Sequence, residues 1–336
     1  MNLLKSRARV LCTHKIPDVG LRLLQEHMDV IILDENGSLK PQLLEILPTV
    51  DYLIPLLSVE ITDVLLESAP NLKGIANYAV GYNNIEIEAA INRNILVTNT
   101  PDVLTNATAD LAWGLILSVT RRIIEGDIIC RNNTFPGWLP EYLLGFEITG
   151  KTLGIIGLGR IGTAVAKRAI GFDMKVLYYS RSRKIEFEKK FGFIYKENLD
   201  DLLREADIIS LNLPYTPETQ EIISKREFTL MKSSAYLINT ARGKLVNEKD
   251  LITALKQKKI AGAGLDVFYD EPHIPKELRE LSNVVLTPHI GSATIKARNA
   301  MAKIVADNIL AMERDEEPPN LIPEMKKKQQ KQNQSN

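Results

Sequence analysis

TLGIIGLGRIGTAVAKRAI, residues 152–170, joins an apolar run to a segment with helical spacing through three glycines. Gly157, Gly159 and Gly162 fit the pattern G-x-G-x-x-G between a buried strand and a helix, the context that a dinucleotide-binding turn requires. The first glycine permits a tight turn, the second lets a pyrophosphate approach the backbone, and the third lets helix and strand pack closely. The alternative is a glycine-rich turn without a ligand. The predicted cofactor turn also contains Leu158, Arg160 and Ile161.

On both sides of this turn, short apolar runs alternate with amphipathic segments, the pattern of a doubly wound α/β fold. Before the turn, the pattern predicts strands at 9–13, 30–33, 52–55, 72–77 and 96–98, and helices at 19–26, 40–47, 61–68 and 87–93. After it come the predicted strands KVLYYS, ADIISLNL, AYLINT, GAGLDVF and NVVLTP. We therefore predict an α/β protein with two Rossmann-like doubly wound domains.

Two long helices, predicted at 104–131 and 292–314, connect these two series of strands. The connection inserts the nucleotide-binding domain into the substrate domain, and a central cleft between them is the expected place for a ligand. The predicted substrate-binding domain is discontinuous and comprises residues 1–100 and 290–322. The predicted NAD(P)-binding domain comprises residues 101–289, and a disordered tail is predicted at 323–336.

The bulk composition excludes several classes of protein. The 336 residues are too many for one compact core, and 45% hydrophobic with 25% charged residues is ordinary for a globular chain. Since 42 basic residues balance 42 acidic ones, neither nucleic acid nor a membrane is expected as a partner. No signal peptide is recognisable, so we expect a cytoplasmic protein. Cys12 and Cys130 fit no metal or disulfide spacing, and we expect both to be buried and no metal to be bound.

The position that distinguishes NAD from NADP has no carboxylate. An NAD site usually has an acid about twenty residues past the glycine turn, where it binds the ribose. Here Ser180 stands 18 residues past Gly162, followed by Arg181, Ser182 and Arg183. A hydroxyl with guanidinium groups suits a 2′-phosphate, so we predict that NADPH is preferred and that NADH is possible. A solvated basic loop is the alternative.

Three further segments accompany the glycine turn: NTARG at 239–243, GLDVFYDEP at 264–272 and PHIGS at 288–292. With GLGRIG and the inserted domain, they resemble the D-isomer-specific 2-hydroxyacid dehydrogenase family over about residues 8–322. Within it, NYAVGYNNI, TPDVLTNATADLA, YYSRSRK and LNLPYTPETQ are most similar to glyoxylate and hydroxypyruvate reductases. The resemblance implies reduction of glyoxylate, or another small 2-keto acid, by NAD(P)H, and a homodimer formed through the nucleotide-binding domain.

The resemblance also implies roles for individual residues. Arg242 would hold the substrate's carboxylate and carbonyl oxygen, His289 would donate the proton during reduction, and Glu271 would be its carboxylate partner. Glu271 is preferred to Asp270 because the family motif has the acid directly before proline. Leu57 and the backbone amides of Ala79, Val80 and Gly81 would contact the substrate. The nicotinamide side of the cofactor would contact Asn239, Thr240, Ala241, Asp266, His289, Ile290 and Gly291.

These residue types suit the chemistry on their own. Reduction of a carbonyl leaves negative charge on oxygen, and histidine is a natural proton donor near neutral pH. A neighbouring carboxylate favours the protonated imidazole, and arginine binds a carboxylate through charge-assisted hydrogen bonds. The alternatives are a structural role for His289 in its turn and a capping role for Arg242 at a strand end. Trp138 and Tyr142, in an irregular aromatic stretch, either cover a pocket or form a hydrophobic brace.

One other function and several other substrates remain open at this point. Transcriptional corepressors that sense nicotinamide nucleotides share this fold and cofactor site, and fold alone does not identify function. The complete set of Arg242, Glu271 and His289 favours an enzyme. Among enzymes, the other substrates are hydroxypyruvate, phosphoglycerate and bulkier keto acids.

Overall fold

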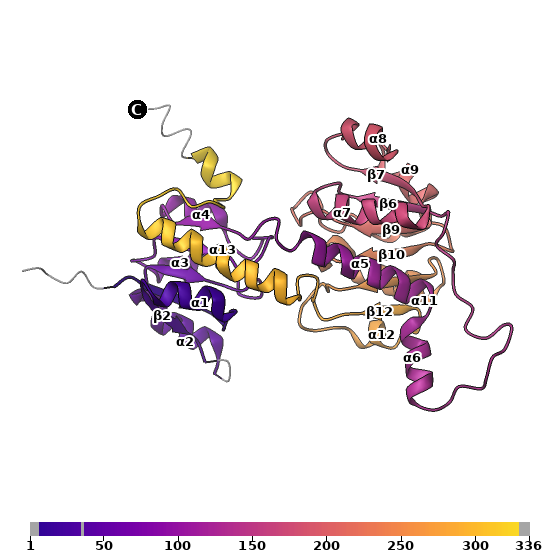
Figure 1. The fold of residues 1–336 in the computed structure, drawn as a ribbon, viewed down its shortest axis with the longest axis horizontal. Helices are drawn as coiled ribbons and strands as arrows, with labels where there is room; N and C mark the ends of the chain where they lie inside the picture. Colours follow the sequence, from indigo (N-terminus) through magenta and orange to yellow (C-terminus); the bar gives the residue numbers. More distant parts are fainter. Residues whose placement is uncertain (1–6, 35–36, 329–336) are drawn as a thin grey trace, which may run out of the picture. The chain divides into compact units, whose positions relative to one another are not determined.

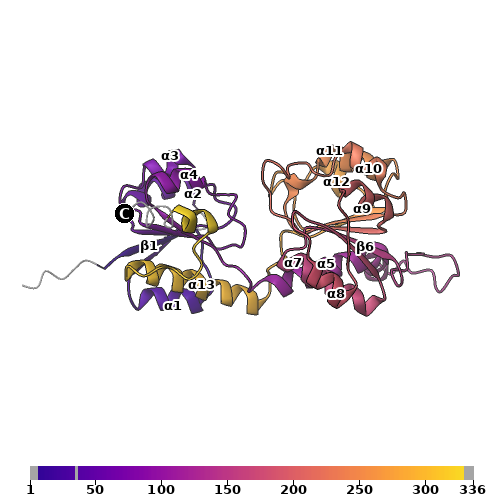
Figure 2. The ribbon, with the colours of Figure 1, turned by 90° about the horizontal axis from the view of Figure 1, so that it is seen from above.

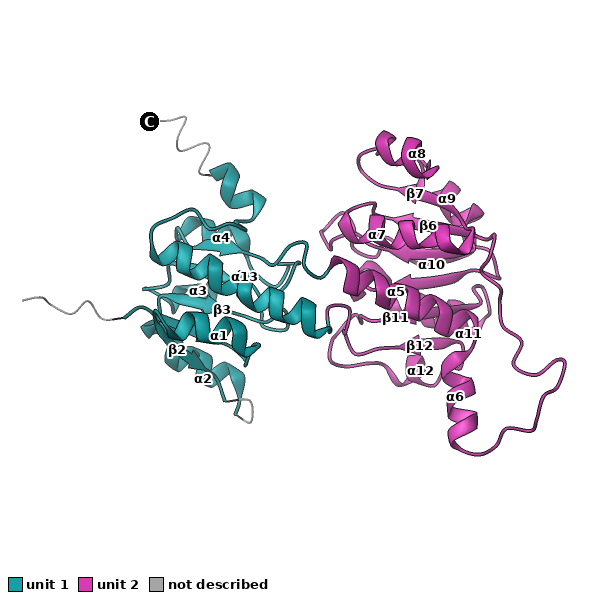
Figure 3. Cartoon of the chain, viewed as in Figure 1, with its two compact units in different colours: residues 1–104, 293–336 teal, residues 105–292 magenta. Residues whose placement is uncertain are grey.

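The computed structural model describes residues 7–34 and 37–328. The chain forms two compact units, which we call unit 1 (residues 1–104 and 293–336) and unit 2 (residues 105–292) (Figure 3). Each unit contains one sheet of parallel strands with helices on both faces, so the predicted fold class is confirmed. The chain passes between the units after Leu104 and after Ser292, where the sequence predicted residues 100 and 289.

Unit 1 contains a five-stranded sheet of order β2-β1-β3-β4-β5. Figure 2 shows α2, α3 and α4 on one face of this sheet and α1 and α13 on the other. All elements predicted for residues 9–98 are present, each with bounds within two residues of the prediction. The strands are β1 (Arg9–Cys12), β2 (Asp29–Ile32), β3 (Tyr52–Ile54), β4 (Gly74–Ala76) and β5 (Leu96–Thr98). The helices are α1 (Asp18–Gln25), α2 (Leu39–Ile46), α3 (Asp63–Glu67), α4 (Ile87–Asn92) and α13 (Ile295–Glu313).

Unit 2 contains a seven-stranded sheet of order β12-β11-β10-β9-β6-β7-β8, with the glycine turn after its central strand β6. The strands are β6 (Thr152–Ile156), β7 (Lys175–Tyr179), β8 (Ile194–Tyr195), β9 (Ile208–Leu211), β10 (Tyr236–Asn239), β11 (Gly262–Leu265) and β12 (Val284–Leu286). The helices are α5 (Thr105–Thr120), α6 (Ile123–Arg131), α7 (Arg160–Ala169), α8 (Ile185–Phe191), α9 (Leu199–Glu205), α10 (Lys225–Leu230), α11 (Glu248–Lys256) and α12 (Lys276–Arg279). The two-residue strand β8 was not among the predicted elements.

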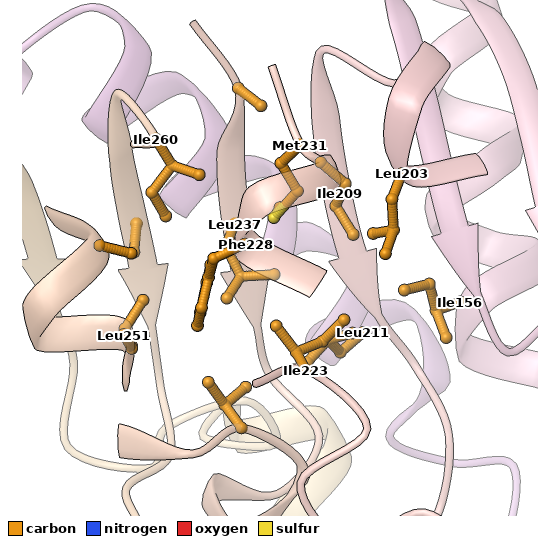
Figure 4. Close-up of a cluster of buried hydrophobic side chains, with 14 of the residues drawn as sticks. Ile156, Leu203, Ile209, Leu211, Ile223, Phe228, Met231, Leu237, Leu251 and Ile260 are labelled. Carbon is orange, nitrogen blue, oxygen red and sulfur yellow. The ribbon is translucent and has the colours of Figure 1, made fainter. Parts of the chain in front are cut away.

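Each face of the unit 2 sheet has its own apolar core. Under α9, α10 and α11, side chains such as Phe228 and Leu211 are almost completely buried (Figure 4). On the other face, Trp113 of α5 stacks on Phe172 at 4.6 Å, and its indole N–H donates to the Val165 carbonyl at 3.0 Å. Burial of each large apolar side chain contributes about 1.5–3 kcal/mol, so these two cores hold the strand ends in place.

The single helix predicted at 104–131 is two helices, α5 and α6. Arg122 between them has φ 54°, a left-handed conformation that ends α5. The Thr120 carbonyl accepts a hydrogen bond from the Phe146 amide at 2.7 Å, so the returning chain satisfies the helix end. This long-range contact has no local signal, which is why helical spacing alone predicted one continuous helix.

Two other predictions need correction. Cys12 is buried, as expected, but Cys130 is exposed because α6 has no buried residue. Within the predicted disordered tail, residues 323–328 form a helical turn, and residues 329–336 lie outside the described part of the chain. Met325 is buried in the unit 1 core, and the Tyr82 hydroxyl donates to Glu324 at 3.1 Å. The mostly polar composition of the tail predicted disorder here, and the contribution of Met325 to the core could not be recognised from composition.

Candidate functional site

The glycine turn has the backbone that a phosphate site needs. Gly157 has φ +95°, which favours glycine. A Cβ atom at Gly162 would lie 2.1 Å from the Gly157 carbonyl oxygen, so helix α7 can approach the turn only through glycine. A Cβ at Gly159 would meet no atom of the described chain within 4 Å, so the turn is open on that side. No side chain caps the N-terminus of α7, whose amides and dipole favour an anion.

Two buried polar atoms in the loops after β9 and β10, at the same edge of the sheet as this turn, are placed where a bound dinucleotide could reach them. Asn212 Oδ1 and Thr240 Oγ1 are buried and have no hydrogen-bond partner among the described residues. Asn212 follows β9, and its amide donates to the Ile156 carbonyl at the end of β6 at 2.8 Å. An unsatisfied buried acceptor costs about 1–3 kcal/mol, which a bound nucleotide can relieve. The residues at this sheet edge therefore fit a dinucleotide, and Asn212 is a candidate contact that the sequence did not single out.

The loop after β7, residues 180–184, is held by α8. Arg183 donates two hydrogen bonds to Glu188, at 2.8 and 2.7 Å, and the Tyr178 hydroxyl donates a third at 2.7 Å. The Arg183 bonds, followed by the Tyr178 bond, lower the pKa of Glu188 to about 2. The Ser180 hydroxyl donates to the Ser182 carbonyl at 2.7 Å. In this structure Arg183 is therefore paired with Glu188, whereas Arg181 is exposed. That either arginine offers charge to a phosphate stays a prediction.

The structure brings His289 and Glu271 together. His289 Nδ1 lies 2.7 Å from Glu271 Oε2, and the Phe268 amide donates to Glu271 Oε1 at 2.9 Å. Both side chains remain about one-third exposed, 35% for His289 and 34% for Glu271. Burial raises the pKa of Glu271, but the hydrogen bond and charge of His289, the Phe268 amide and the charge of Arg242 outweigh it and lower that pKa. The ionised carboxylate thus fixes Nδ1 as a donor, and Nε2 is the ring nitrogen that can serve a substrate.

Asp266 holds the turn that presents His289. Its buried carboxylate accepts hydrogen bonds from the Thr287 hydroxyl at 2.7 Å and from the Ile290 and Gly291 amides at 2.8 Å each. The His289 amide donates to the Asp266 carbonyl at 2.9 Å. His289 has φ 52°, a left-handed conformation that is uncommon for a residue with a Cβ and that these bonds stabilise. Burial raises the pKa of Asp266, although the three hydrogen bonds oppose that rise.

Arg242 lies in the turn after β10, which packs directly on the turn that carries Glu271. A Cβ at the next residue, Gly243, would lie 1.8 Å from the Phe268 carbonyl oxygen, so only glycine allows this approach. Asn239 shapes the turn, since its side chain donates to the Arg242 carbonyl at 2.8 Å and accepts from the Ala241 amide at 3.0 Å. Burial lowers the pKa of Arg242, and the charge of Glu271 opposes this. The structure therefore groups Arg242, Glu271 and His289 at one edge of the sheet, as predicted.

The other predicted substrate residues belong to unit 1. Leu57 follows β3, and Ala79, Val80 and Gly81 follow β4, so all four lie at the carboxyl edge of that sheet. Leu57, Val80 and Gly81 are partly exposed, whereas Ala79 is buried. Parallel α/β sheets bind ligands at this edge.

Across residues 7–34 and 37–328, no group of three or more His, Cys, Asp or Glu side chains could hold a metal ion. In the same described residues, no helix is long and apolar enough to cross a membrane.

Comparison with known proteins gives consistent matches over nearly the whole chain. Residues 113–291 match the family model of the D-isomer specific 2-hydroxyacid dehydrogenase NAD binding domain. The chain is 49% identical over 321 residues to the glyoxylate reductase of Pyrococcus furiosus, which covers 94% of this chain and 95% of that protein. Among solved structures, the NADPH-dependent glyoxylate/hydroxypyruvate reductase of Sinorhizobium meliloti, in complex with NADP and malonate, has a TM-score of 0.84 and 32% identity. That match covers 95% of this chain and 98% of the other. The glyoxylate reductase of Paecilomyes thermophila has a TM-score of 0.86 and 30% identity, and covers 96% of this chain and 100% of its own.

Proposed function

Because the chain belongs to the D-isomer-specific 2-hydroxyacid dehydrogenase family, we propose that it is a glyoxylate reductase that also accepts hydroxypyruvate. The observation that carries this proposal is the group of Arg242, Glu271 and His289 in the sheet that also bears the glycine turn. A nucleotide-binding module without catalysis would not require a one-third exposed histidine paired with a carboxylate. The similar reductase of Pyrococcus furiosus, of nearly the same length, supports glyoxylate as the substrate.

In this proposal a bound nicotinamide cofactor supplies the hydride, and the chain supplies positioning and a proton. His289 donates its Nε2 proton to the carbonyl oxygen as negative charge develops there. Glu271 keeps the imidazole in the required tautomer and stabilises its protonated form. Arg242 binds the substrate carboxylate and carbonyl oxygen with charge-assisted hydrogen bonds.

The proposed cofactor contacts follow the carboxyl edge of the unit 2 sheet. The glycine turn would bind the pyrophosphate through backbone amides, and the loop after β7 would bind the adenosine ribose. We propose NADPH as the preferred cofactor because Ser180 replaces a repelling carboxylate and Arg181 is exposed. The proposed contacts are Gly157, Leu158, Gly159, Arg160, Ile161, Gly162, Ser180, Arg181, Ser182, Asn212, Asn239, Thr240, Ala241, Asp266, His289, Ile290 and Gly291.

We further propose that the protein is a homodimer. The segment from α6 to β6 runs away from the body of unit 2 and returns (Figure 1). A segment that exposes many large apolar side chains is typical of an interface, here with a second copy of the chain. Analytical ultracentrifugation should give twice the 37.7 kDa chain mass, and Trp138→Arg should shift the distribution toward the monomer. The segment exposes seven large apolar side chains: Ile123, Ile124, Ile128, Phe135, Trp138, Leu139 and Leu144.

The direct test of the proposed activity is a mass balance. Purified protein with glyoxylate and NADPH should consume NADPH and form glycolate in equal amounts. Protein that binds NADPH tightly but forms no product from any small 2-keto acid would instead support a nucleotide-sensing role.

A further inference from the structure

Three consecutive carbonyl groups in the loop after β4 are bound from the inside of unit 1. The Ala79 carbonyl accepts from the Thr100 amide at 2.9 Å. The Val80 carbonyl accepts from the Asn99 side chain at 2.7 Å, and the Gly81 carbonyl accepts from the Asn77 side chain at 2.8 Å. Three separate donors hold these three successive carbonyls, so the peptide planes of the loop are fixed in one orientation.

Two backbone amides of the same loop, those of Val80 and Gly81, remain available to bind a ligand. In the described chain, the Val80 and Gly81 amides donate no hydrogen bond to another residue, and both residues are partly exposed. Successive backbone amides whose carbonyls are bound elsewhere form a concave anion-binding group. This group has no charged side chain of its own, so its affinity depends on how well the peptide planes are held.

A buried pair of asparagines orients the Asn77 side-chain amide, which donates to the Gly81 carbonyl. Asn77 and Asn84 exchange hydrogen bonds through their side-chain amides, at 3.2 Å in each direction. Asn77 Oδ1 accepts a hydrogen bond from Asn84, which fixes the orientation of the Asn77 amide group. Asn77 Nδ2 therefore faces the Gly81 carbonyl. Asn84 Nδ2 also donates to the Leu56 and Val59 carbonyls, at 3.3 and 3.1 Å, so the pair ties this loop to the loop that contains Leu57. Both asparagines are buried, so none of their bonds is exposed to competition from bulk water.

We propose that Asn77, Asn84 and Asn99 are positioning residues that hold the Val80 and Gly81 amides ready for the substrate carboxylate. This inference rests on the proposed function, since it concerns the recognition of a 2-keto acid. A positioning role predicts a specific kinetic pattern: substrate binding weakens, while cofactor binding and turnover at saturating substrate change little.

The test uses changes from amide to carboxylate, which keep the shape and remove the donor. Asn99→Asp replaces the donor to the Val80 carbonyl with a repelling oxygen at a partly exposed position, so folding should survive. Asn77→Asp does the same at the buried Gly81 contact. Asn92→Asp, on the exposed end of α4, is the matched control. We expect the glyoxylate KM to rise about tenfold or more in Asn99→Asp and Asn77→Asp, with the NADPH Kd within twofold of wild type.

A second measurement, hydrogen exchange, reports ligand binding at the Val80 and Gly81 amides without requiring turnover. Oxamate, an unreactive 2-keto acid analogue, should slow hydrogen exchange in the peptide containing Val80 and Gly81 in wild type and in Asn92→Asp, but not in Asn99→Asp. Unchanged KM together with full oxamate protection in Asn99→Asp would overturn the inference. A wild-type protein that reduces no glyoxylate, but shows oxamate protection that is lost in Asn99→Asp, would count against the proposed function and support the positioning role.

Discussion

Two loops of unit 2 each hold a basic side chain against a carboxylate, with opposite consequences. In the turn after β12, Glu271 and Asp266 orient His289, and one imidazole nitrogen remains for chemistry. In the loop after β7, Glu188 accepts hydrogen bonds from Nε and Nη2 of Arg183, so most of that charge is balanced within the loop. The Glu271 carboxylate bonds one nitrogen of its basic partner and leaves the other for a substrate, whereas Glu188 bonds two nitrogens of Arg183 side by side.

The comparison predicts its largest effect at His289. His289→Ala should lower turnover of glyoxylate by about 10²- to 10⁴-fold, because the proton donor is lost. The NADPH Kd should stay near that of wild type, measured by fluorescence titration. His273→Ala is the matched control, since that histidine is exposed and should leave the rate unchanged. A loss below tenfold in His289→Ala would remove this residue from the mechanism.

The next effect concerns the residue that holds the turn. In Asp266→Asn, a side-chain NH₂ would face an amide donor that the carboxylate now accepts, either Ile290 or Gly291. Leaving such a buried bond unmade costs about 1–3 kcal/mol. We expect turnover to fall about ten- to hundredfold through misplacement of His289. If the His289→Ala change has the same effect in the Asp266→Asn background as in wild type, the two residues act independently and the positioning account is wrong.

A smaller effect on the preference for NADPH over NADH should distinguish Arg181 from Arg183 in the loop after β7. One charge-assisted contact from Arg181 should favour NADPH over NADH about tenfold in kcat/KM, less at high salt. Arg181→Ala should abolish most of this preference, and Ser180→Asp with Arg181→Ala should reverse it. Arg183→Ala should change the preference by less than threefold, because Glu188 already pairs with Arg183. Equal loss in the two single variants would show that Arg183 reaches the cofactor.

The smallest predicted effect is a pH dependence of stability. The pKa of Glu271 in the folded protein lies below the ordinary value of 4.5, so its ionised form stabilises the fold above about pH 4.5. That contribution is lost as the pH falls through the lowered pKa. Thermal unfolding should therefore show that Glu271→Gln lowers the Tm at pH 7 and that the difference shrinks toward pH 3. A difference that is constant with pH would contradict the lowered pKa of Glu271.

The two loops also show what a sequence can predict. The glycine turn and the segment around His289 were predictable because their function depends on backbone conformations that few residues allow. The Arg183–Glu188 pair was not, since it depends on how α8 folds back over Tyr178. The break between α5 and α6, and Met325 in the unit 1 core, were missed for another reason: each depends on contacts between residues far apart in the chain. Asn212 was missed because a strand-end asparagine has no distinctive spacing.

The most direct test of the central claim is the kcat/KM of wild-type protein for glyoxylate, hydroxypyruvate and phenylpyruvate, each with NADPH and with NADH. The proposed function predicts rapid reduction of glyoxylate, turnover of hydroxypyruvate, and much slower reduction of phenylpyruvate, whose ring is far larger than a hydroxymethyl group. Faster reduction of phenylpyruvate than of glyoxylate, or no turnover of any of the three by protein that binds NADPH, would contradict it.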